Sequence, residues 1–109
     1  MMSDSENNIQ FNYLYRDAAN FKVFGHEIFS NPERLELKLI DEEIRKSIID
    51  GLFFDPDFCG IKRLKHDDWI SKLDHTWNEY EFVESTIDNP TVNFSVKEFL
   101  LLLSMIPKY

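Results

Sequence analysis

The chain has 109 residues, of which 43% are hydrophobic and 15% aromatic, so it can bury one modest core. Its formal net charge of −8 argues against a protein that binds nucleic acid by neutralising phosphates, because such proteins carry clustered Lys and Arg. The longest apolar run, from Phe99 to Ile106, is too short to span a bilayer.

The first eight residues are polar and acidic, without the basic and apolar regions of a signal peptide. They predict a disordered tail in front of a single domain over residues 9–109. The only cysteine, Cys59, cannot form an internal disulfide, which favours a reducing, cytoplasmic location. Beside Phe58, it is expected to be a small buried residue and not a nucleophile.

Two strands are predicted to open the domain as a β-hairpin. In residues 9–16 aromatic and polar side chains alternate, with Phe11, Tyr13 and Tyr15 on one face. Residues 21–30 form the second strand, in which Gly25 indicates a bulge or a close backbone approach.

The connection between these strands contains charged residues. Arg16 and Asp17 are expected to form a hydrogen-bonded pair that fixes the turn. The alternative is that Arg16 and Lys22 are exposed and bind an anionic group.

A helix is predicted after the turn at residues 30–33, with Gly51 as its C-cap. Its apolar residues recur at steps of three and four and lie within about 120° of one another, which is one buried stripe. The stripe consists of Leu37, Ile40, Ile44, Ile48 and Leu52.

The dipeptide Asp55-Pro56 predicts a turn after this helix, since proline excludes the helical region for the residue before it. Phe53, Phe54 and Phe58 are expected to fold back beneath this loop. Residues 64–73 fit a short helix or an irregular segment equally well.

Residues 77–85 are predicted to form a third strand, in which neither face is purely apolar. Regular alternation would place Glu79 and Glu81 on the same face, with side chains roughly 6 to 7 Å apart. Ser95 and Glu98 then form a capping box that opens a final helix over residues 96–106.

The final helix is apolar on every side, which indicates burial on both faces. One face contains Val96, Phe99, Leu100 and Leu103. The other, with Leu101, Leu102 and Met105, is open to two interpretations. In the first, this face contacts a protein partner or a second copy of the chain, which would make a homodimer. In the second, the loop that contains Phe53, Phe54 and Phe58 covers it.

Acidity is concentrated in residues 67–88, which contain seven acids and one base. One interpretation is a solvated strand face that prevents edge-to-edge aggregation. The other is a docking surface for a basic protein partner. The expected partner-binding residues are Asp74, Trp77, Glu79, Glu81 and Glu84, together with Leu101, Leu102 and Met105 of the final helix.

Histidine and carboxylate side chains in the same region could bind a metal ion. No H-x-x-x-H or H-E-x-x-H motif occurs, so the spacing does not place two ligands on one helix face. In the alternative interpretation, His75 donates a hydrogen bond to Asp74 or Glu79 and fixes the loop. The candidate metal ligands are His66, Asp74, His75 and Glu79, with Asp67 and Asp68 nearby. We expect no cofactor, since the chain contains no Gly-rich phosphate loop.

Three segments carry a resemblance to a known family: YRDAANFKVFGHEIFSNP, IIDGLFFDPDFCGI and DHTWNEYEFVEST. They resemble a family of small uncharacterised bacterial proteins with YRDxxNxK, GxFF and DHxWxE segments in this order. The resemblance covers residues 13–86, and it implies a bacterial or phage origin and no activity for any residue. A histidine often follows the Trp in such proteins, where this chain has Asn78, which argues further against a histidine-rich metal site.

The sequence thus predicts an α+β domain of β-β-α-β-α order, an antiparallel sheet with both helices on one face. The expected function is a non-enzymatic protein-interaction module with an acidic surface, such as an inhibitor or immunity-type protein. Its partner is expected to be a basic or nucleic-acid-handling protein. The alternative is a small metal-dependent enzyme that uses the His/Asp/Glu cluster.

Overall fold

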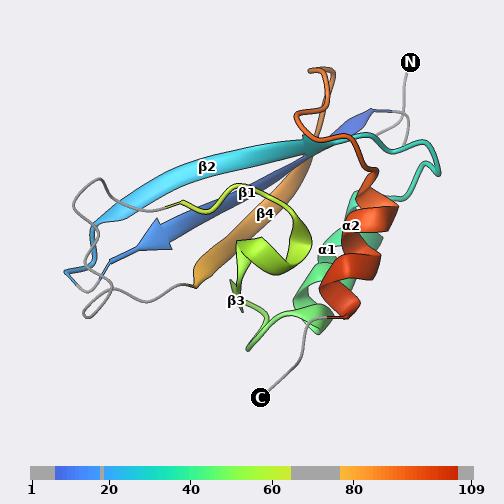
Figure 1. Ribbon diagram of the computed structural model, residues 1–109. Helices are drawn as coiled ribbons and strands as arrows, with labels where there is room; N and C mark the ends of the chain where they lie inside the picture. Colours follow the sequence, from blue (N-terminus) through green and yellow to red (C-terminus); the bar gives the residue numbers. More distant parts are fainter. Residues whose placement is uncertain (1–6, 18, 65–76, 106–109) are drawn as a thin grey trace.

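The computed structural model describes residues 7–17, 19–64 and 77–105 (Figure 1). The strands are β1 (Asn8–Arg16), β2 (Lys22–Phe29), β3 (Phe53–Phe54) and β4 (Asn78–Thr86). The helices are α1 (Leu37–Ser47), the short 3₁₀ helix η2 (Pro56–Cys59) and α2 (Val96–Ser104).

The strands form one antiparallel sheet in the order β2-β1-β4-β3, with α1 and α2 on one of its faces (Figure 1). The predicted α+β class and β-β-α-β-α order are confirmed, and the two-residue strand β3 is added to them. The sequence did not predict β3.

The predicted hairpin is confirmed, because β1 and β2 pair without interruption from Ile9 opposite Phe29 to Arg16 opposite Lys22. Strand side chains alternate between faces, so every second residue of β1 points to the helices. Ile9, Phe11, Tyr13 and Tyr15 lie on this helix-covered side, and each is at most 1% exposed.

Phe11 lies at the centre of the core. Its ring is stacked on Tyr80 at 5.2 Å between centroids and meets Phe99 of α2 edge-on at 5.0 Å. The rings of Tyr13, Phe29 and Phe54 surround it at distances of 5.4 to 6.4 Å. Ile40 and Ile44 of α1 and Leu103 of α2 complete the same cluster, so one core joins the sheet to both helices.

The predicted C-cap at Gly51 is wrong, because α1 ends at Ser47 and Ile48 already has an extended backbone. Asp50 and Gly51 instead have positive φ values of 55° and 67°. Positive φ at two consecutive central residues is typical of the type I′ turn, which joins antiparallel strand segments. The backbone groups of Ile49 and Phe53 bond to each other across this turn, which directs the chain into β3.

Only part of the aromatic loop folds inward as predicted. Phe54 is 2% exposed and belongs to the core, whereas Phe58 is 58% exposed. In η2 the inward positions are taken by Pro56 and Cys59, which are both buried, so the ring of Phe58 points to solvent. Residues 65–73 of the stretch left undecided lie outside the described residues.

A β-bulge at Glu81 interrupts the regular alternation of β4. Asn12 lies opposite Phe82, whereas the next residue of β1, Tyr13, lies opposite Tyr80, so Glu81 is the extra residue on β4. The bulge turns both Tyr80 and Val83 toward the helices, although they are three residues apart. The predicted regular alternation of β4, which placed Glu79 and Glu81 on the same face, is therefore wrong from the bulge onward.

Arg45 of α1 fixes the bulge from the helix side. Its guanidinium lies 4.8 Å from the ring centroid of Tyr80 and donates to the backbone carbonyl of Glu81 at 3.2 Å. Asp41, one turn earlier, accepts hydrogen bonds from both Arg45 and the Tyr80 hydroxyl. The end of α1 is thus bonded to the irregular part of β4.

The capping box predicted at the start of α2 is present. The Ser95 hydroxyl accepts from the backbone N–H of Glu98, whose carboxylate accepts from the backbone N–H of Ser95. Val96, Phe99 and Leu103 of α2 are buried against the sheet, as predicted.

Gly25 marks a close approach, one of the two structures predicted for it. A Cβ atom at this position would lie 2.7 Å from Cδ2 and 3.0 Å from Cδ1 of Leu64. Leu64 is itself 8% exposed and packed in the core, so its side chain has little room to move.

We therefore expect Gly25→Ala to lower the free energy of unfolding by about 1 to 3 kcal/mol, the usual range for overpacking a core. The same change in a Leu64→Ala background should cost much less, because the clashing methyl groups are gone. Urea unfolding of the two single variants and the double variant measures this coupling. An equal cost in both backgrounds would show that Leu64 is not the source of the strain.

Candidate protein-binding face

The side of the sheet that faces away from α1 and α2, here called the outer sheet face, carries a mixture of aromatic, amide and charged side chains. The register gives its members, because residues directly opposite each other point to the same face. They include Gln10, Asn12, Leu14 and Arg16 of β1, Lys22, Phe24 and His26 of β2, and Glu79, Phe82 and Glu84 of β4.

At one end of this face, Glu79 forms an ion pair with Arg16. The guanidinium Nε lies 2.8 Å from a Glu79 carboxylate oxygen, and the Glu79 side chain is only 9% exposed. This hydrogen bond raises the pKa of Arg16. The Glu79 carboxylate is therefore paired with a base on the neighbouring strand, and its contact with a partner stays a prediction.

The predicted pair between Arg16 and Asp17 is wrong. Arg16 bonds to Glu79 and to the side chain of Asn20. The Asp17 carboxylate instead accepts from the backbone N–H groups of Ala19 and Phe21, each at 2.9 Å. An Asp side chain is suited to such a turn because it reaches backbone donors a few residues ahead. Both residues fix the hairpin, but through different partners.

Glu84 is exposed and held in place. One of its carboxylate oxygens accepts from the side-chain amides of Asn12 at 2.9 Å and Gln10 at 3.3 Å. The Gln10 amide also donates to the Asn12 oxygen at 2.9 Å, so the three side chains form one network across two strands. A carboxylate fixed in this way loses little rotational freedom when it meets a positively charged group.

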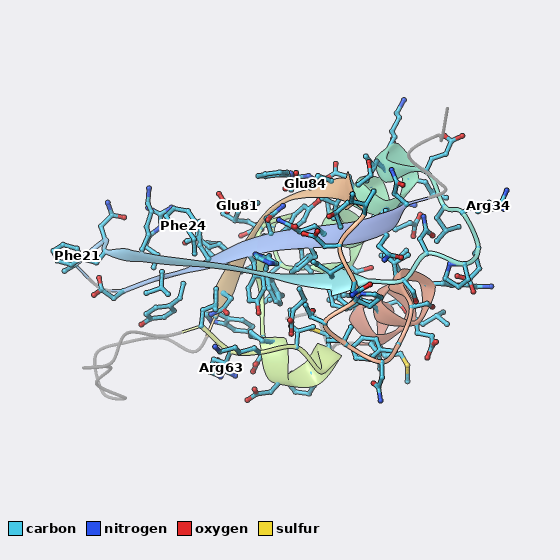
Figure 2. The ribbon with its side chains drawn as sticks, turned by 90° about the horizontal axis from the view of Figure 1, so that it is seen from above. Phe21, Phe24, Arg34, Arg63, Glu81 and Glu84 are labelled. Carbon is cyan, nitrogen blue, oxygen red and sulfur yellow. The ribbon has the colours of Figure 1, made fainter. Side chains whose placement is uncertain are left out.

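Phe82 lies two residues from Glu84 on the same face and is 48% exposed. Glu81 is half-buried at the bulge beside it, and Asp88 follows β4 as an exposed residue. Residues 77–88 contain four acids and no base. Figure 2 shows Glu81 and Glu84 along β4, on the side of the molecule away from α2. An exposed aromatic ring thus lies within a negatively charged strip.

The second apolar side of α2, formed by Leu101, Leu102 and Met105, is not part of the outer sheet face. Leu101, Leu102 and Met105 are 57%, 36% and 76% exposed, so the described residues leave this side open. Partner binding by these three residues stays a prediction. The homodimer through α2 stays a prediction.

Of the candidate metal ligands, only Glu79 lies among the described residues, and its carboxylate is bonded to Arg16. His66, Asp74 and His75 lie outside them, as do Asp67 and Asp68. The described residues contain no group of three or more metal-ligating side chains. Two of the expected partner-binding residues also belong to this region. Asp74 lies outside the described residues, and Trp77 is half-buried just before β4.

Cys59 is fully buried, and its thiol lies 3.5 Å from the backbone carbonyl oxygen of Pro56. Burial, together with the charges of Asp55 and Asp57, raises the pKa of this thiol to about 12. A thiolate is the nucleophilic form of cysteine, so this environment suppresses reactivity. The expectation of a small buried residue is confirmed.

Comparisons with protein-family models, with curated proteins and with solved structures each gave no match. The resemblance to small bacterial proteins therefore stays a prediction. Within the part of the chain that the structure describes, no helix is long and apolar enough to cross a membrane.

Sequence reasoning missed Phe82, Gln10 and Asn12 as members of the candidate face. The polar alternation of β1 already indicated that Asn12 points away from the core. The pairing of Asn12 with Phe82 could not be found this way, because the two residues are 70 positions apart and the bulge shifts the register.

Proposed function

We propose that this protein is a protein-interaction module that binds a basic partner through the outer sheet face around Phe82 and Glu84, together with Glu81 at the adjoining bulge. The observation that carries the proposal is the fixed, exposed carboxylate of Glu84 beside the exposed ring of Phe82. A carboxylate next to an aromatic face suits an arginine or lysine of a partner, through a charge-assisted hydrogen bond and a cation–π contact. An inhibitor or immunity-type role, in which this face covers the basic surface of a nucleic-acid-handling protein, is the form that we favour.

The net charge of −8 supports the same proposal, since it attracts basic proteins over a distance and raises their association rate. The fixed network also places the charge on a rigid sheet and not on a loop, which favours a defined binding geometry.

The test uses the double variant Glu81→Lys/Glu84→Lys. Its matched control is Glu33→Lys/Glu42→Lys, which makes the same change in net charge at exposed residues outside the outer sheet face. Glu79 is left intact, because its reversal would place a lysine against Arg16 and damage the fold. Proteins retained from a lysate of the source organism at low and high salt supply the candidate partner, which is then purified.

We expect the Glu81/Glu84 variant to bind the purified partner at least about tenfold more weakly, which is a loss of about 1.4 kcal/mol. The control should change the Kd much less, and binding of the native chain should weaken as salt rises. Titration calorimetry measures the Kd, and circular dichroism shows that both variants are folded. Equal losses in both variants, or salt-insensitive binding, would remove the outer sheet face from consideration.

A further inference from the structure

β2 is an edge strand, and its backbone groups follow a pattern that can be assigned residue by residue. The backbone N–H of Ile28 donates to the Thr91 hydroxyl at 2.8 Å, and its carbonyl accepts from the Thr91 N–H at 2.9 Å. Both groups therefore point away from β1. In an antiparallel ladder the direction alternates from residue to residue, and β1 and β2 pair without a bulge. The backbone groups of Lys22, Phe24 and His26 consequently point outward as well.

At the other end of the strand, the carbonyl of Phe21 accepts from Asp17 within the hairpin, which agrees with this assignment. No described residue donates to or accepts from the outward groups of Lys22, Phe24 and His26. The segment that leads from β4 to α2 covers the edge only near Ile28 and Ser30 (Figure 1). With respect to residues 7–17, 19–64 and 77–105, a free edge therefore extends over residues 22–26.

Aromatic side chains accompany this free edge. Phe24 is 61% exposed and Phe21 is 67% exposed, and Figure 2 shows both at the end of the hairpin farthest from the helices. A long edge strand with exposed apolar side chains is a template for another strand, and natural proteins cover such edges. The partner that suits this edge is an extended segment whose own backbone N–H and C=O groups are unpaired.

We propose that the free edge of β2 pairs with the same edge of a second copy of the chain, antiparallel and about a two-fold axis at Phe24. This register places Phe24 opposite Phe24 of the second copy. It also places Lys22 opposite His26, in both directions. Three outward-facing residues on each strand then exchange N–H···O bonds in hydrogen-bonded pairs.

Pairing between two copies is favoured because the free edge over residues 22–26 is symmetric about its middle residue. It is limited on one side by the hairpin turn and on the other by Thr91, and Phe24 is its middle residue. The two Phe24 rings would meet on the outer sheet face, where aromatic cross-strand pairs stabilise a sheet. The two-fold arrangement uses both free edges and closes the assembly, whereas the opposite edge of each sheet is the two-residue strand β3.

The backbone of His26 provides the first test, with sedimentation equilibrium of the full chain over a range of concentrations. Because the His26 N–H points outward, His26→Pro removes a donor from the dimer and none from the β1 ladder. His26→Ala is the matched control, since it removes the side chain and keeps the donor. We expect a dimer for the native chain and for His26→Ala, and at least a tenfold weaker dimer for His26→Pro.

The side chain of Phe24 provides a second test in case the proline disturbs the strand. Phe24→Lys should dissociate the dimer because it places two ammonium groups opposite each other, whereas Phe82→Lys, on the same face but away from the edge, should not. Dimerisation should strengthen with salt, since salt screens the repulsion between two chains of charge −8. This is the reverse of the salt effect expected for the basic partner, so the two proposals fail independently.

Cross-linking tests the register. Oxidation of the Phe24→Cys variant should yield a covalent dimer, because Cα atoms about 5.5 Å apart in a hydrogen-bonded pair can be joined by a disulfide. Oxidation of Lys22→Cys should not, since four residues of strand separate the two positions by about 14 Å. The native Cys59 is buried and does not compete.

A monomer at every concentration and salt level would overturn the proposal. So would a dimer that persists in both His26→Pro and Phe24→Lys and is lost in Leu101→Glu, which would place the interface on α2. Covalent dimers formed equally by Phe24→Cys and Lys22→Cys would overturn the two-fold register at Phe24.

Discussion

Replacing Phe11 with alanine should lower the free energy of unfolding by about 3 to 5 kcal/mol, the usual cost of removing a large aromatic ring from a core. Phe11 is 1% exposed, and its ring contacts aromatic rings from the sheet and from α2. The space left by the ring borders both layers, so neither can close it without moving against the other.

Phe58→Ala is the matched control for this change, because it removes the same side chain from a position that is 58% exposed. It should alter stability by no more than about 0.5 kcal/mol, as is usual for surface substitutions. Urea unfolding followed by tryptophan fluorescence measures both values. A similar loss in the two variants would mean that Phe11 is not the centre of the core.

Stability should also fall steeply in alkaline solution, starting near pH 9. Burial, together with nearby acidic charge, raises the pKa of the Cys59 thiol from 9.0 to about 12, and burial likewise raises the pKa values of the Tyr13 and Tyr80 hydroxyls above 10.0. The hydrogen bond from Tyr80 to Asp41 acts in the same direction. In all three groups the folded chain keeps a proton that the unfolded chain releases.

The sign follows from proton linkage. The folded state binds more protons than the unfolded state once the pH exceeds the unfolded pKa values, so the free energy of unfolding falls as the pH rises. The stabilisation is fully present below about pH 9. Each group contributes a slope of at most about 1.4 kcal/mol per pH unit.

Urea unfolding between pH 8 and pH 11, with tyrosinate absorbance as a second signal, measures this loss. In Cys59→Ala the decline should begin about one pH unit higher, since the tyrosines then titrate first. Tyr80→Phe should reduce the slope above pH 10 by about a third. A free energy of unfolding that stays constant up to pH 11 would contradict the protonated, buried state of these groups.

Features with a local physical cause could be predicted from the sequence. The hairpin follows from alternation in β1, the position of α1 from its apolar stripe, and the start of α2 from the Ser95 and Glu98 capping box. The turn at Asp50 and Gly51 had a local signal too, because Asp-Gly is a preferred type I′ pair, but the end of the stripe at Leu52 favoured a longer helix.

Features set by contacts between distant segments could not be predicted. The bulge at Glu81 depends on how β4 aligns with β1 while Arg45 bonds to the Glu81 carbonyl. The ion pair of Arg16 with Glu79 joins residues 63 positions apart, so no local sequence pattern indicates it. The acidic character of β4 was evident from composition, but which of its acids are exposed and which are bonded within the fold was not.

The central position of β1 has a consequence for synthesis of the chain on the ribosome. β1 is made first and can pair with β2 at once, but its other neighbour, β4, and the covering residues Phe99 and Leu103 emerge much later. Until then the nascent hairpin exposes both the second edge of β1 and its row of aromatic side chains. Exposed apolar side chains and unpaired strand edges of this kind make an intermediate prone to aggregate and dependent on chaperones. The yield of folded protein should therefore depend on how fast the C-terminal third of the chain is made.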